Sequence, residues 1–118
     1  MIDYELFTRL YDEALSYKEV DFFIAERGWQ EWMNSFEEVE TITKILKTIY
    51  KYSRCSIKDI RNELNISRAS FSRKYGIPLR TIEDWDAGKS KIPEYTEKLI
   101  KYTLFVKEMM PDEEDSTE

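Results

Sequence analysis

A glycine and a proline, Gly76 and Pro78, divide the stretch 66–93 into two short helical patterns. The first pattern begins at Ser67, because serine commonly caps a helix N-terminus, and it ends at Gly76, because glycine readily adopts the left-handed backbone of a helix C-terminus. Pro78 has a preset φ that suits the start of a second helix. Two short helices joined by so short a turn indicate a helix-turn-helix.

Each of the two patterns has one apolar side. Phe71 and Tyr75 are four residues apart in the first pattern, and Ile82 and Trp85 are three apart in the second, so each pair shares one helix face. We expect these two faces to pack on each other. The opposite side of the second helix, predicted over 78–87, is then available to a partner.

The order of core and turn residues in this stretch resembles the helix-turn-helix domain of the lambda and 434 repressor superfamily, also called the Xre family. The resemblance covers about residues 56–107 and depends on Ile66-Ser67, Phe71, Gly76-Ile77, Ile82, Trp85, Gly88-Lys89 and Pro93. It implies a sequence-specific transcriptional regulator that binds double-stranded DNA. Such a protein is repressor-like and autoregulatory, comes from a phage or mobile element, and binds paired half-sites as a homodimer.

The resemblance also implies which residues contact DNA. In this motif the second helix lies in the major groove and its first residues touch base edges. Arg80 is the strongest candidate, because arginine can bond bidentately to guanine. The implied base-reading residues are Leu79, Arg80, Thr81, Glu83 and Asp84, and the implied phosphate contacts are Arg68, Arg73, Lys89 and Lys91.

The formal net charge of −6 is unevenly distributed along the chain. Residues 1–53 hold six basic and eleven acidic side chains (net −5), residues 54–101 hold eleven and seven (net +4), and residues 102–118 hold one and six (net −5). The positive charge therefore lies on the predicted helix-turn-helix, as binding to phosphate requires.

Apolar periodicity predicts further helices over 4–17, 18–27, 37–53 and 94–108, and Ser56 is expected to cap another helix. Its inner face is predicted to consist of Ile57, Ile60 and Leu64, with Arg54, Lys58 and Arg61 outside that face. In the last helix, spacings of four, three and four predict an inner face made of Tyr95, Leu99, Tyr102 and Val106.

The predicted fold is all-α: a small helical bundle with a lambda-repressor-like helix-turn-helix domain, preceded by an N-terminal helical extension. Residues 1–53 would form the N-terminal helical region, used for packing or dimerisation, and residues 54–110 the DNA-binding domain. Residues 111–118 contain five acidic side chains and are expected to form a disordered tail.

For two apolar features of the N-terminal region, the sequence leaves open whether they pack inside the chain or contact another protein. The helix predicted over 37–53 has a wide apolar stripe, which either packs on the preceding helices or pairs with its twin in a second subunit. Of these, dimerisation is favoured. The tryptophans of this region form either a small core or an exposed patch for a partner. The candidate dimer or partner interface is Trp29, Trp32, Ile42, Ile45, Leu46 and Ile49.

Composition argues against an enzyme, a metal site and a cofactor site. The chain has no histidine, which removes the commonest acid-base group and zinc ligand, and its three glycines form no phosphate-cradling loop. One cysteine, Cys55, fits a reducing compartment. No apolar run approaches the length of about 18 residues that marks a membrane span. The first residues, MIDYELF, include acids where a signal peptide would have basic residues, so we expect a cytoplasmic protein.

Two other functions remain open, and both involve a protein partner. Some phage-encoded anti-CRISPR proteins resemble helix-turn-helix regulators fused to another segment, and an acidic surface can compete for the basic channel of an RNA-guided nuclease. An antitoxin that binds its toxin is the other possibility. In the nuclease inhibitor, residues 1–53 would carry the activity, whereas a neighbouring toxin gene would indicate the antitoxin.

Overall fold

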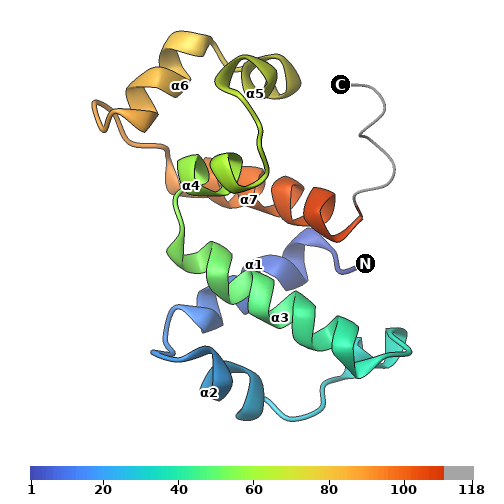
Figure 1. Ribbon diagram of the computed structural model, residues 1–118. Coiled ribbons are helices and arrows are strands. Elements are labelled where there is room, and N and C mark those ends of the chain that lie inside the picture. The colour runs from blue at the N-terminus through green and yellow to red at the C-terminus, as the bar shows by residue number, and fades with distance from the viewer. Residues whose placement is uncertain (111–118) are drawn as a thin grey trace.

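The computed structural model describes residues 1–110, in which seven α-helices and one 3₁₀ helix are present and strands are absent (Figure 1). The prediction of an all-α fold is confirmed, whereas the tail predicted at 111–118 lies outside the described residues. None of the helices in the described part is long and apolar enough to span a bilayer. The elements are α1 (Tyr4–Ala14), α2 (Val20–Ala25), η1 (Glu31–Ser35), α3 (Val39–Arg54), α4 (Ile57–Glu63), α5 (Arg68–Tyr75), α6 (Leu79–Asp86) and α7 (Glu94–Met109).

The helices are arranged along the longest dimension of the molecule, which measures 44 Å. Figure 1 shows α5 and α6 together at one end and α2 at the other, with α4 and α7 beside each other between them. Helix α7 contacts α1, α3 and α4, so it joins the two ends. As a result, α5 and α6 project from a base formed by the rest of the chain.

Local signals determine the ends of α4 and α5 as predicted. The hydroxyl oxygens of Ser56 and Ser67 accept hydrogen bonds from the N–H groups of Asp59 and Ser70, each at 3.0 Å. Gly76 ends α5 with φ +66°, in the left-handed region that glycine adopts without a steric penalty. The connection between α5 and α6 therefore takes only three residues.

The N-terminal helices are shorter than predicted. Helix α1 ends at Ala14 instead of residue 17, because the N–H groups of Ser16 and Tyr17 donate to the carbonyl oxygens three residues back, at 3.1 and 3.2 Å. The guanidinium of Arg54 donates to the carbonyl oxygens of Ala14 (3.0 Å) and Tyr17 and so satisfies acceptors at this helix end. Helix α2 spans only Val20–Ala25, and the 3₁₀ helix η1 was not predicted.

The apolar stripe of α3 is buried within a single chain. Helix α3 contacts α1, α2 and α7, which cover its apolar side. The four predicted interface residues on this helix therefore form no exposed surface, and the physical reason is that intramolecular packing already removes them from water. These residues are Ile42, Ile45, Leu46 and Ile49.

The buried face of α7 differs from the predicted one. Tyr95 and Leu99 are 71% and 49% exposed, so the prediction that they face inward is wrong, whereas Tyr102 and Val106 are half-buried. Because α7 packs on α1, α3 and α4 at once, these neighbours select a different stripe of the helix. The residues buried on α7 are Ile100, Lys101, Leu104 and Phe105.

Lys101 is a charged residue inside this core, with 2% of its surface exposed. Its Nζ donates to the hydroxyl of Tyr11 at 2.9 Å and to the carbonyl oxygen of Tyr52 at 2.8 Å. The same Nζ lies 3.0 Å from a carboxylate oxygen of Glu97. A buried ammonium is tolerated only when it is paired and hydrogen-bonded, and these contacts join α1, α3 and α7.

We predict that Lys101→Ala lowers the free energy of unfolding by about 3 kcal/mol, because it leaves buried oxygens without their donor. Lys98→Ala is the control, since Lys98 pairs with the exposed carboxylate of Asp12 at 2.8 Å and such a pair contributes at most about 1 kcal/mol. Urea unfolding followed by circular dichroism measures both. Equal losses for the two variants would contradict the role assigned to Lys101.

Candidate nucleic-acid interface

Helices α5 and α6 pack through the side chains that the sequence predicted. Phe71 and Ile82 are buried, and the ring centroids of Phe71 and Tyr75 are 4.5 Å apart. The hydroxyls of Tyr75 and Thr103 are hydrogen-bonded, which ties α5 to α7. Burial raises the pKa of the Tyr75 phenol, so this residue remains a neutral hydrogen-bonding group. The two helices are thus fixed to each other and to the base.

An ion cluster of Arg61, Arg68 and Asp86 joins α4, α5 and α6. Oδ2 of Asp86 accepts from Nη2 of Arg61 at 2.5 Å and from Nε of Arg68 at 2.9 Å. The side chains of Arg61 and Asp86 are only 4% and 7% exposed. The prediction that Arg61 lies on the outer side of its helix is therefore wrong, because the buried carboxylate of Asp86 draws the guanidinium inward.

Arg68 differs from Arg61 because half of its side chain, 50%, is exposed. The hydrogen bond to Asp86 and the charge of that carboxylate raise the pKa of Arg68, whose guanidinium is charged in any case. The bond to Asp86 uses Nε, which leaves the outer end of the guanidinium towards solvent. This predicted phosphate contact is therefore held in place at the first residue of α5.

The predicted base-reading residues all lie on α6. Leu79, Arg80 and Glu83 are exposed, and Thr81 and Asp84 are half-buried. Nε of Arg80 lies 3.5 Å from Oδ1 of Asp84, one helical turn away. Such an exposed pair contributes little stability, so Arg80 can exchange Asp84 for another acceptor at small cost.

The other predicted phosphate contacts are also exposed. Arg73 lies in the last turn of α5, whereas Lys89 and Lys91 lie in the segment between α6 and α7. The backbone N–H of Lys89 donates to the carbonyl oxygen of Asp84 at 2.8 Å, which holds that segment against the end of α6. All four cations therefore come from α5 and the segment that follows α6.

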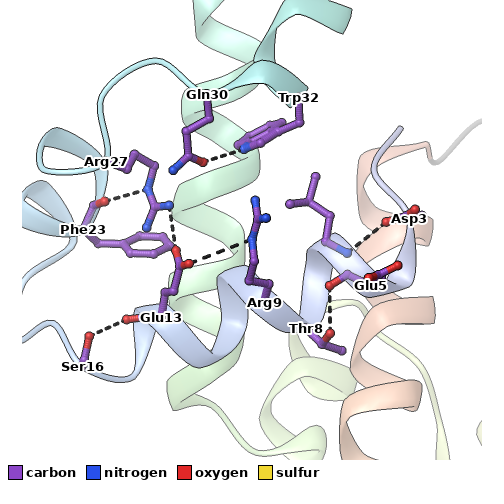
Figure 2. Close-up of polar contacts among 11 residues, drawn as sticks. Asp3, Glu5, Thr8, Arg9, Glu13, Ser16, Phe23, Arg27, Gln30 and Trp32 are labelled. Carbon is purple, nitrogen blue, oxygen red and sulfur yellow. Dashed lines mark hydrogen bonds and ion pairs between the residues drawn. The ribbon is translucent and has the colours of Figure 1, made fainter.

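The tryptophans of the predicted partner interface lie in and beside η1, away from α5 and α6 (Figure 1). Trp29 is 61% exposed and Trp32 is half-buried. In Figure 2, the indole N–H of Trp32 donates to the side-chain oxygen of Gln30 at 2.8 Å, and Arg9 of α1 lies opposite. An open hollow lies between η1 and α1 and is lined in part by these three residues.

Sequence reasoning missed Asp86 and misplaced Arg61, although a signal for both was present. Arg61 follows Ile57 by four residues, and Asp86 follows Ile82 by four, so each charge shares a face with a core residue. Two opposite charges on inward faces of neighbouring helices indicate a buried pair. Groups of three or more side chains placed to hold a metal ion are absent from the described residues.

Comparison of the chain with protein-family models, with curated proteins and with solved structures finds no match.

We predict that Asp86→Ala lowers the free energy of unfolding by about 3 to 5 kcal/mol, because it leaves the buried guanidinium of Arg61 without a counter-charge. Asp84→Ala on the same helix is the matched control. It removes an exposed pair with Arg80 and should cost less than about 1 kcal/mol. Thermal and urea unfolding measure both variants, and a cost for Asp86→Ala no larger than that of the control would exclude a structural role of the cluster.

Proposed function

We propose that this protein is a sequence-specific DNA-binding transcriptional regulator in which α5 and α6 act as a helix-turn-helix and α6 enters the major groove. One observation carries the proposal. Leu79 and Arg80, the first two residues of α6, are exposed, whereas Ile82, which lies on the opposite side of the helix from Arg80, is buried where α6 contacts α5. This arrangement presents the start of α6 to a partner, as base reading requires.

Phosphate contacts would set the position of α6 on the duplex. Arg68 begins α5, and Asp86 fixes its guanidinium with the outer end exposed. Arg73, Lys89 and Lys91 add three exposed cations around the same two helices. Contacts of this kind orient a protein on DNA without reading sequence, and they make binding weaker as salt rises.

Base reading would depend mainly on Arg80. In the free protein its guanidinium pairs with Asp84 at 3.5 Å, and on DNA it would turn to guanine, whose two acceptors it can bond bidentately. Leu79 would contact a thymine methyl group, and Asp84 would disfavour bases that offer only acceptors to it. A regulator of this kind represses its own gene by occupying the DNA upstream of it.

A homodimer on paired half-sites remains part of this proposal, with one restriction. Ile42, Ile45, Leu46 and Ile49 are buried inside each chain. Two subunits would therefore associate through other side chains.

A protein partner is a second candidate, and exposed Trp29 favours it. Tryptophan is enriched in interface hot spots, and exposed Glu26 and Glu31 flank Trp29 in the sequence. An exposed segment of this acidic and aromatic composition suits a basic partner. A phage-encoded inhibitor of an RNA-guided nuclease, or an antitoxin, would use this segment.

We predict that Arg80→Ala weakens binding to the DNA upstream of the gene by about 1 to 3 kcal/mol and relaxes selectivity at one base position. Arg68→Ala should weaken binding to all sequences alike and reduce the slope of log affinity against log salt by about one. Fluorescence anisotropy with upstream and scrambled duplexes across a salt series measures both effects.

Lys44→Ala is the control. Lys44 is exposed on α3, so this substitution removes one positive charge at a place away from α5 and α6. Wild-type protein that binds upstream and scrambled DNA equally at every salt concentration would refute the regulator. In that case Trp29→Ala should be tested for loss of binding to a nuclease or toxin.

A further inference from the structure

An open hollow of about 440 Å³ lies between the turn that joins α4 to α5, helix α5 itself and the last turn of α7. Two cations line it, Arg73 of α5 and Lys107 of α7. Among the described residues, no acidic side chain lines it. The hollow is therefore a positively charged surface beside the helix that bears two of the proposed phosphate contacts. The rest of its wall consists of Leu64, Asn65, Ile66, Ser67 and Ser70.

The acidic residues that adjoin this wall in the sequence are bonded to other partners. A carboxylate oxygen of Glu63, the last residue of α4, lies 2.5 Å from Nζ of Lys51 on α3. Glu108, which follows Lys107, accepts a hydrogen bond from the hydroxyl of Tyr52 at 2.6 Å. Both carboxylates thus face residues of α3, and neither lines the hollow.

The chain itself supplies a segment of opposite charge close to the hollow. Residues 111–118 contain five acidic and no basic side chains. Helix α7 ends at Met109, only two residues after Lys107, so the acidic segment begins within a few residues of the wall. Eight extended residues span at most about 28 Å, whereas α5, with eight helical residues, is about 12 Å long. The segment is therefore long enough to reach along α5.

We propose that the segment 111–118 binds in this hollow, with its carboxylates against Arg73 and Lys107, and competes there with the phosphate groups of DNA. Arg73 is also a proposed phosphate contact, so it cannot pair with the segment and with DNA at the same time. The competition rests on the proposed function, whereas the docking of the segment does not. The segment acts as an intramolecular inhibitor that weakens binding to all DNA sequences alike, because phosphate contacts do not read sequence.

The docking is tested with a nitroxide spin label at residue 116 of the full chain, attached through Ser116→Cys in a Cys55→Ser background. We expect the label to broaden the backbone amide NMR signals of residues 64–73. The signals of α2, at the other end of the molecule, should stay sharp (Figure 1).

The control is the same labelled chain with a neutral segment, which has equal length but no charge. Its broadening at residues 64–73 should be weaker, and about 0.5 M sodium chloride should weaken the broadening in the acidic chain as well, because salt screens exposed charges. The neutral segment carries Asp112→Asn, Glu113→Gln, Glu114→Gln, Asp115→Asn and Glu118→Gln.

Arg73→Gln locates the contact, and Lys74→Gln is its matched control. Both side chains are exposed neighbours on α5, but only Arg73 lines the hollow. Arg73→Gln should reduce the broadening at residues 64–67, whereas Lys74→Gln should reduce it much less. Equal broadening by the acidic and the neutral segment, or an equal loss in the two lysine and arginine variants, would overturn the docking.

The competition is tested by fluorescence anisotropy with the wild-type chain and the chain with the neutral segment. We expect the neutral segment to raise DNA affinity about fivefold at about 0.1 M salt, the equivalent of two exposed ion pairs, for upstream and scrambled duplexes alike. A chain with five other exposed acids neutralised should gain less, because charges further from DNA than the Debye length of about 10 Å are screened. These acids are Glu19, Asp21, Glu31, Glu37 and Glu38.

The outcomes separate this inhibition from the regulator itself. Equal DNA affinity of the wild-type chain and the chain with the neutral segment would overturn the competition. Binding of no duplex by either chain would refute the regulator, and the spin-label measurement would still decide whether the segment docks.

Discussion

The arrangement of α4, α5 and α6 depends on the hydrogen bonds that the carboxylate of Asp86 accepts. It lies at the last residue of α6 and accepts hydrogen bonds from Arg61 of α4 and Arg68 of α5, at 2.5 and 2.9 Å. Burying charges costs desolvation energy, so the net stabilisation from such a cluster is small even though breaking it is costly. Its main effect is geometric, because both guanidinium groups must lie within hydrogen-bonding distance of the same carboxylate oxygen.

The parts of the fold that depend on local chemistry could be predicted from the sequence. The hydroxyls of Ser56 and Ser67 at helix starts accept from an N–H three residues later, and Gly76 at a helix end acts through its own backbone. The exposure of Arg80 followed from helical periodicity, because Arg80 lies on the opposite side of α6 from buried Ile82. These features therefore needed no knowledge of the rest of the chain.

The features that depend on distant neighbours were missed. Arg61 and Lys101 are charged side chains, which are usually exposed, and each is buried because it pairs with groups from other helices. The buried stripe of α7 was also misplaced, since Tyr95 and Leu99 have the correct spacing but no neighbour to cover them. Periodicity indicates that a helix is amphipathic, whereas its neighbours determine which of two adjacent stripes is covered.

The contacts between α1 and α7 also have a consequence for the order in which the chain folds. The hydroxyl of Tyr102 donates to the carbonyl oxygen of Ile2 at 2.9 Å, and Lys101 reaches Tyr11, so residues 90 to 100 positions apart are joined. Contacts between such distant residues slow folding, because a long loop must close before they form. During synthesis, α1 leaves the ribosome long before α7 does. The apolar face of α1 is therefore covered by α3 and not by α7 until synthesis is nearly finished.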